Sequence, residues 1–202
     1  MPARLQLDRL SARHVGPVDL AIAAGECVCL AGESGSGKTL LLRAIADLDP
    51  HHGEAWLDGT ACSRLPAPQW RRSVALVAAE SQWWADAVGA HFPGGVRGEW
   101  LDELALPREA IDWSVARCST GERQRLALLR TLMLEPPVVL LDEPTGNLDA
   151  ASAQRVEALL AAYREEHRAA LLWVSHDAQQ IARVAQRCFV LVDGRLEAGD
   201  RR

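Results

Sequence analysis

The chain has 202 residues, of which 49% are hydrophobic, and its formal net charge at pH 7 is −5. This length and apolar content predict one substantial hydrophobic core and a single domain over residues 1–202. Because no dense basic cluster occurs, the sequence excludes an electrostatic nucleic-acid surface. No apolar run approaches the roughly 20 residues of a membrane span, and residues 1–10 lack the apolar core of a signal peptide, so we expect a soluble, intracellular protein.

The N-terminal part of the chain predicts a small antiparallel sheet and then a buried strand. Residues 5–11 and 18–23 alternate loosely between apolar and polar side chains, which favours an antiparallel pair. Residues 27–31 are apolar throughout, as is typical of a strand buried on both faces, and a helix is expected to follow them. Another short strand is expected at residues 54–57, and residues 63–70, which contain two prolines, are interpreted as a connecting segment.

The rest of the chain alternates strands with helices. In chain order we expect a strand at 74–78, a helix from 119 to the prolines at 136 and 137, a strand at 138–141, a helix from about 149 to 167, a strand at 170–174, a helix at 178–186 and a closing hairpin over 188–197. Glycine and proline punctuate residues 83–115, which we interpret as part of a small helical subdomain at approximately 83–134. The alternation predicts an α/β fold with a parallel sheet and a site at the carboxyl ends of its strands.

Residues 32–39, here called the phosphate loop, have the sequence Gly-Glu-Ser-Gly-Ser-Gly-Lys-Thr between an expected strand and an expected helix. The pattern G-x-x-x-x-G-K-[ST] in this context predicts a triphosphate site, because glycines let successive N–H groups face one anion. Lys38, the only lysine in the chain, is the compact cation that such a tight loop can accommodate. The predicted nucleotide-binding residues of this loop are Gly32, Glu33, Ser34, Gly35, Ser36, Gly37, Lys38 and Thr39.

Polar residues at the ends of two later strands complete the predicted hydrolytic site. Thr39 can bind Mg²⁺ and Asp142 can hold its water shell, so we predict both as metal ligands. Glu143 is free to act as the base for a water that attacks a phosphate. His176, at the end of the strand at 170–174, is expected to hydrogen-bond the γ-phosphate, so Glu143 and His176 are the predicted catalytic residues.

The five cysteines show no paired zinc spacing, so we expect reduced thiols. Cys27 and Cys29 lie two residues apart on one expected strand and therefore face the same side of it. We interpret both as small core residues rather than metal ligands.

Taken together, these motifs resemble the ATP-binding cassette (ABC) ATPase family over nearly the whole chain. The phosphate loop resembles the family's Walker A motif, residues 138–144 its Walker B motif with the catalytic glutamate, residues 146–149 its D-loop, and residues 174–177 its H-loop. The resemblance implies a P-loop NTPase fold with a central mostly parallel sheet, an N-terminal antiparallel β subdomain and a small α-helical subdomain. It also implies ATP and Mg²⁺ as cofactors.

Residues 118–122, Cys-Ser-Thr-Gly-Glu, followed by Arg-Gln-Arg, are similar to the family's signature sequence. Ser119 with Glu122 three residues later is also a capping box that any helix can use. The two interpretations are compatible, because a capped helix N-terminus offers free N–H groups and a positive dipole to a phosphate. The resemblance implies a homodimer in which Ser119, Gly121 and Glu122 of one chain contact the ATP bound by the other.

Three positions depart from the family's pattern. Ala79 stands where the glutamine of the family's Q-loop is expected, so either Gln82 reaches the site or hydrolysis is slow. The aromatic residue that usually stacks on adenine is missing, and Arg13 or His14 is nearest to that place, so we expect relaxed nucleotide selectivity. Thr120 replaces a signature glycine and adds a side chain near the phosphate contact.

We therefore expect the ATPase subunit of an ABC transporter, peripheral on the inner face of the cell membrane, that drives a permease through residues 79–88 and the helical subdomain. The permease is expected to be a separate protein, because the sequence contains no membrane span. Trp83 and Trp84 are interpreted either as part of an apolar docking surface or as core residues. The short cassette is similar to small two-component exporters, and the sequence indicates no substrate.

Two other functions stay open. One is a soluble ABC ATPase that acts on ribosomes or DNA, although the basic linkers and long insertions typical of such proteins are not visible. The other is a regulatory module that binds ATP with little or no turnover. Ala79 favours this second alternative, whereas the presence of Glu143 and His176 disfavours it.

Overall fold

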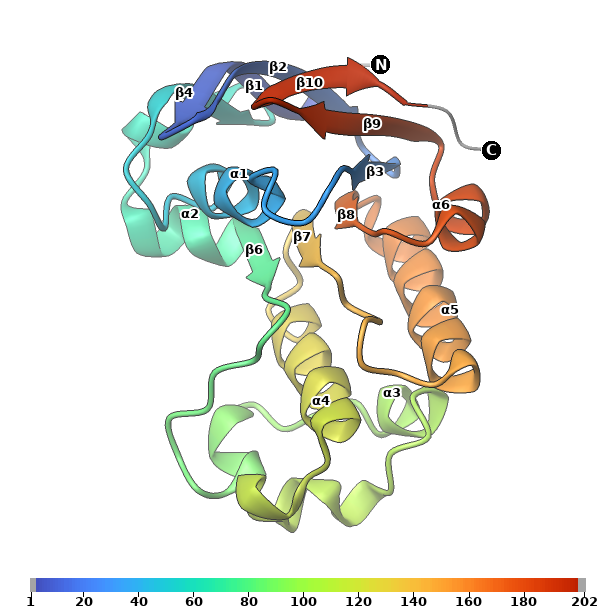
Figure 1. The fold of residues 1–202 in the computed structure, drawn as a ribbon. Helices are drawn as coiled ribbons and strands as arrows, with labels where there is room; N and C mark the ends of the chain where they lie inside the picture. The colour runs from blue at the N-terminus through green and yellow to red at the C-terminus, as the bar shows by residue number, and fades with distance from the viewer. Residues whose placement is uncertain (1–2, 200–202) are drawn as a thin grey trace.

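The computed structural model describes residues 3–199, which form two sheets with helices packed around them (Figure 1). The smaller sheet is antiparallel, with strand order β2-β1-β4-β5. Its strands are β1 (Ala3–Ala12), β2 (Val15–Ala23), β4 (His52–Leu57) and β5 (Thr60–Ala61). Val18, Leu20 and Ile22 of β2 are buried while the residues between them are exposed or half-buried, so one face of this sheet covers the core. The expected antiparallel pair is confirmed.

The larger sheet has six strands in the order β10-β9-β3-β8-β7-β6. Its strands are β3 (Cys27–Ala31), β6 (Val74–Val77), β7 (Val138–Asp142), β8 (Ala170–Val174), β9 (Arg187–Val192) and β10 (Arg195–Ala198). All its neighbouring strands pair in parallel except β9 and β10, which form the expected closing hairpin. Because β3, β8 and β7 are adjacent and parallel, their carboxyl ends meet at one edge, as the sequence predicted.

Most helices lie where the sequence predicted them, and one was missed. The α-helices are α1 (Lys38–Ile45), α2 (Ala67–Ser73), α3 (Gly98–Glu103), α4 (Thr120–Leu132), α5 (Ala150–His167) and α6 (Ala178–Val184). The interpretation of residues 63–70 as a plain connection is wrong, because α2 begins there. Pro66 and Pro68 lie at the cap and in the first turn of α2, where a missing N–H breaks no helical hydrogen bond.

Residues 78–118, here called the lower segment, contain little regular structure. Besides α3, they form three short 3₁₀ turns, and they lie below the sheets in Figure 1, where α4 runs upward from them towards β7. The three complete turns after β6 are Val88–His91, Arg108–Asp112 and Val115–Arg117. The frequent glycines and prolines limit helix length here, so the expected mostly helical insertion consists largely of single turns.

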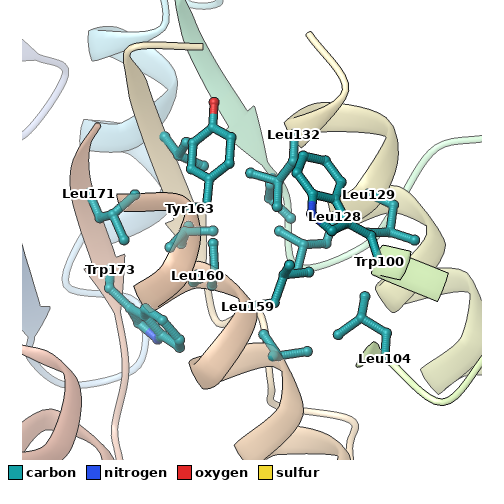
Figure 2. Packing of buried hydrophobic residues seen from close by; sticks show 14 of the residues in the cluster. Trp100, Leu104, Leu128, Leu129, Leu132, Leu159, Leu160, Tyr163, Leu171 and Trp173 are labelled. Atoms are coloured by element: carbon teal, nitrogen blue, oxygen red, sulfur yellow. The ribbon is translucent and has the colours of Figure 1, made fainter. Parts of the chain in front are cut away.

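Two hydrophobic clusters cover the two faces of the larger sheet. One joins β3 and β7 to β1, β2 and α1, whereas the other joins the same strands to α4, α5 and the lower segment. Figure 2 shows the second cluster, in which Trp100 of α3 lies beside the leucines of α4, and its ring centroid is 6.2 Å from that of Tyr163 on α5. Cys27 and Cys29 belong to this second cluster, which confirms that they are core residues.

Within residues 3–199, no helix is both long and apolar enough to cross a membrane.

Candidate active site

The phosphate loop follows β3 and leads into α1, which begins at Lys38. Gly37 has φ +102°, and a Cβ at this position would lie 2.3 Å from Val15 Cγ2, so the loop requires glycine there. Gly32 has φ +142°, and a Cβ there would lie 2.7 Å from the carbonyl oxygen of Leu191. The loop is therefore a tight turn pressed against β2 and β9, and no side chain caps the start of α1.

Lys38 is folded back into the phosphate loop. Its Nζ donates hydrogen bonds to the carbonyl oxygens of Gly32 at 2.9 Å and Glu33 at 2.7 Å, and the side chain is buried. Burial lowers the pKa of Lys38, while the nearby carboxylates of Glu143 and Asp142 oppose that shift. The hydroxyl of Ser36 is also buried, without a hydrogen-bond partner among the described residues. The loop thus holds a cation and a free hydroxyl where an anion would bind.

Thr39 and Asp142 are hydrogen-bonded across two elements that lie far apart in the sequence. Thr39 Oγ1, in the first turn of α1, donates to Asp142 Oδ2 at the end of β7 over 2.8 Å. Burial raises the pKa of Asp142, and the hydrogen bond from Thr39 partly offsets this. Hydroxyl and carboxylate oxygens are the ligands that Mg²⁺ prefers, so this pair fits the metal.

Glu143 and His176 are in direct contact, with His176 Nε2 2.8 Å from Glu143 Oε1. Both side chains are partly exposed, and they come from the segments that follow β7 and β8. Glu143 has φ +48°, a left-handed conformation that is strained for a residue with a side chain. Its carbonyl oxygen accepts hydrogen bonds from Gly146 N at 3.1 Å and Gln124 Nε2 at 3.0 Å, which hold this conformation.

A cavity of about 500 Å³ brings most of the predicted residues together. Its lining contains Ser34, Gly35, Gly37, Lys38, Thr39, Glu143 and His176, together with Arg13, Leu40, Arg43 and Asp49. Gly32, Glu33 and Ser36 line a second cavity on the other side of the loop, with His14 and the β9-β10 hairpin. Arg13 and His14 therefore flank the phosphate loop.

The signature residues lie elsewhere in the chain. Ser119 and Glu122 form the predicted capping box, with Glu122 N 3.2 Å from Ser119 Oγ and Ser119 N 2.7 Å from Glu122 Oε2. The hydrogen bond from the Ser119 backbone lowers the pKa of Glu122. Within the described chain, Ser119, Gly121 and Glu122 do not line the cavity beside Lys38. The structure therefore does not bring the signature residues together with Lys38 and Glu143 in this cavity.

Neither candidate for the Q-loop position contributes to the cavity beside Lys38. Ala79 has no polar side-chain atom, and Gln82 is exposed, with its carbonyl oxygen accepting a hydrogen bond from Arg130 Nη1 at 3.0 Å. Within residues 3–199, neither residue is part of the lining. The site therefore lacks a side-chain oxygen from this segment.

Two buried glutamines were missed by the sequence analysis. Gln124 of α4 and Gln180 of α6 are both 4% exposed, and each donates to a segment that carries a catalytic candidate. A glutamine in an amphipathic helix is normally assigned to the solvent face, so no sequence signal singles out Gln180. Gln124 lies within the Arg-Gln-Arg run after the signature, which is the signal that could have identified it.

A family model described as "ABC transporter" matches residues 15–146. The chain is 43% identical over 189 residues to the aliphatic sulfonates import ATP-binding protein SsuB 3 of Nocardia farcinica, covering 89% of this chain and 71% of the relative. It is 40% identical over 187 residues to SsuB 2 of Frankia alni, covering 89% and 72%. Among solved structures it is similar to a dimeric post-hydrolysis state of the ATP-binding cassette MJ0796 bound to ADP and Pi, with 25% identity, a TM-score of 0.83 and coverage of 98% and 99%.

Proposed function

The chain belongs to the ABC transporter family, and we propose that it is an ATPase subunit that drives transport through a separate membrane permease. ATP binding and hydrolysis are activities of the family. The observation that carries the assignment of the site is the cavity in which Lys38, Thr39, Glu143 and His176 meet. We also propose that residues 1–202 act as one ABC ATPase domain with a helical subdomain at approximately 83–134.

The phosphate loop is proposed to bind the ATP phosphates. Backbone N–H groups and the start of α1 would face the anion, and Lys38 Nζ would exchange its carbonyl partners for phosphate oxygens. Thr39 and Asp142 would hold Mg²⁺, which neutralises charge on the phosphates when it is bound.

Glu143 is proposed to accept a proton from the water that attacks the γ-phosphate. This hydrogen bond would align the lone pair of the water with the phosphorus atom. His176 would donate a hydrogen bond to the γ-phosphate, and its contact with Glu143 keeps both groups on one side of the cavity. Because Ala79 supplies no oxygen towards the metal, we expect slow turnover compared with a site that has a glutamine there.

A second copy of this chain is the proposed partner at the nucleotide. The capped N-terminus of α4 would contact the γ-phosphate of ATP bound by the partner, with Ser119 and Gly121 nearest to it. The Glu122 carboxylate is held by the Ser119 backbone, so we propose that Glu122 shapes the turn rather than contacting phosphate directly. The dimeric solved relative supports this arrangement.

The surface proposed to meet the permease, here called the tryptophan clamp, consists of Trp83, Trp84, His91 and Arg130. The Arg130 guanidinium carbon lies 4.8 Å from the ring centroids of both tryptophans, and Trp84 is 73% exposed. His91 Nε2 accepts hydrogen bonds from Trp84 N at 3.1 Å and Ala85 N at 3.3 Å, which fixes the loop. Trp83 is half-buried and packs against the core, whereas Trp84 is the tryptophan that we propose for the docking surface.

The tryptophan clamp favours a partner segment with an apolar face and a carboxylate. Burial lowers the pKa of Arg130, and within residues 3–199 no carboxylate forms an ion pair with it. A cytoplasmic loop of the permease that carries an aspartate or glutamate would supply the missing charge. Bound in this way, the chain would lie on the inner face of the cell membrane.

The relatives also suggest a substrate class. Both are named as aliphatic sulfonate import proteins, so we propose import of a small organic anion, a direction that the sequence analysis left open.

The central experiment compares the wild type with Glu143→Gln. The wild type should hydrolyse Mg-ATP, while Glu143→Gln should bind ATP, lose turnover and elute as a dimer in size-exclusion chromatography. Unchanged turnover in Glu143→Gln would overturn the assignment of the base.

For the permease, a tagged wild type should recover a multi-span protein from membranes. The double variant Trp84→Ala with Arg130→Gln should not recover it, while its ATPase activity persists.

A further inference from the structure

Gln180 occupies an unusual position for an amide in a surface helix. It lies in the first turn of α6 and is 4% exposed. Its Oε1 accepts a hydrogen bond from Ser175 Oγ at 2.9 Å, and its Nε2 donates to Thr145 Oγ1 and Glu157 Oε1, each at 2.9 Å. Burying an amide is costly unless its hydrogen bonds are made, and here both ends are used.

The partners of Gln180 belong to the two segments that carry the catalytic candidates. Thr145 lies two residues after Glu143, and Ser175 lies directly before His176. Ser175 Oγ also accepts a hydrogen bond from Asp177 N at 3.1 Å, so the backbone is fixed on both sides of His176. One side chain therefore connects the segment after β7 to the segment after β8.

Glu157 and Arg183 determine which way the amide points. Arg183 donates to both oxygens of Glu157, at 3.0 Å and 2.8 Å, and the Glu157 side chain is 10% exposed. If the amide were turned over, its oxygen would face the Glu157 carboxylate, which has no proton to donate. The carboxylate thus selects the orientation that leaves Oε1 free to accept from Ser175.

We propose that Gln180 is a positioning residue for ATP hydrolysis, which holds the backbones of Glu143 and His176 at the separation their contact requires. This proposal rests on the roles proposed above for Glu143 and His176. Gln180 does not line the cavity beside Lys38; it lines a neighbouring cavity with Glu143 and His176, and its side-chain hydrogen bonds reach their segments through Thr145 and Ser175. Misplacement by about 1 Å can cost on the order of a hundredfold in rate.

The test compares Gln180→Leu, Gln180→Glu and the swap Gln180→Glu with Glu157→Gln. In Gln180→Glu two carboxylates face each other, whereas the swap restores one amide and one carboxylate in contact. We expect kcat to fall about tenfold to a hundredfold in both single variants, with the KM for ATP changed less than about twofold, and the swap to recover most of the kcat. Gln179→Leu, an exposed neighbour, is the matched control and should keep the wild-type kcat.

Thermal unfolding, measured alongside, separates positioning from folding. If Gln180→Leu does not fold, Gln180→Glu and the swap still decide the question. Wild-type kcat in Gln180→Glu, or a loss that the swap does not reverse, would overturn the proposal. Glu143→Gln is assayed in parallel, because turnover in that variant would show that the roles proposed for the site are wrong, independently of Gln180.

Discussion

The nucleotide-binding edge of the larger sheet and the lower segment are built on different principles. At the sheet edge, β7 and β8 are buried along their whole length, and residues proposed for the site lie at or just after the end of each strand. The lower segment has one helix of six residues and depends on buried side chains such as Trp100 and Leu104 that pack on α4 and α5. Backbone pairing fixes the first region, whereas a few apolar anchors fix the second.

This difference predicts how each region fails. Substitutions at the sheet edge should remove activity while the fold persists, because the strands are held by hydrogen bonds that no side chain contributes. Substitutions of an apolar anchor in the lower segment should reduce stability, because few other contacts hold that segment in place.

The largest effect is expected for Lys38. Lys38→Ala should abolish ATP binding and lower hydrolysis by at least about a hundredfold, because the loop loses its only buried cation. Lys38→Arg should also fail, since a planar guanidinium does not fit the space between the carbonyls of Gly32 and Glu33. Nucleotide binding by fluorescence and an ATPase assay measure this, with exposed Arg64→Ala as the control. Wild-type activity in Lys38→Arg would contradict the tight fit.

Trp100 should be the most sensitive position of the lower segment. Trp100→Ala should lower the free energy of unfolding by about 3–5 kcal/mol, because a large buried side chain leaves a cavity between α3 and α5. Denaturant unfolding measures this change. Trp84→Ala, at a 73% exposed position, is the matched control and should change stability by less than about 0.5 kcal/mol. Equal effects of the two substitutions would remove the distinction between anchor and surface.

Glu157 links stability to pH. Burial raises its pKa, but hydrogen bonds from Arg183 and Gln180 outweigh this and leave the pKa below its usual value. Because the pKa of Glu157 is lower in the folded state, its ionised carboxylate stabilises the fold. This contribution is fully present above the unfolded-state pKa, about 4.3, and is lost as pH falls through the folded-state pKa. Glu157→Gln should therefore cost about 1–3 kcal/mol at pH 7, and the cost should shrink in acid. Denaturant midpoints from pH 7 down to acid check this; a cost that is constant with pH would contradict it.

The smallest effect is expected at Ala79. Ala79→Gln should raise the Mg²⁺-dependent hydrolysis rate by about tenfold, because it supplies an oxygen that can orient the metal site. The exposed neighbour Ala78→Gln should leave the rate unchanged. Rates measured across a Mg²⁺ titration test this, and an unchanged rate and Mg²⁺ dependence in Ala79→Gln would show that the departure at this position does not slow turnover.

Some of these residues could be predicted from the sequence and others could not. The phosphate loop, Asp142 and the capping box at Ser119 were predictable, because each depends on neighbours within a few residues. The helix α2 was missed because its prolines look like loop residues until the helix start is known. Gln124 was missed although it lies in the Arg-Gln-Arg run after the signature, and the role of Gln180 could not be predicted, because it depends on Thr145, 35 residues away.

The sequence by itself determined the order of strands and helices, the phosphate loop and the pair of acids after β7, since local spacing and hydrophobic pattern specify them. Tertiary structure alone decided that Thr39 meets Asp142 across 103 residues, that His176 meets Glu143, and that the signature residues stay apart from the cavity of their own chain. The physical reason is that parallel pairing brings the carboxyl ends of β3, β7 and β8 to one edge of the sheet. Which buried polar side chains hold the site residues in place is then decided by how the helices pack on that edge.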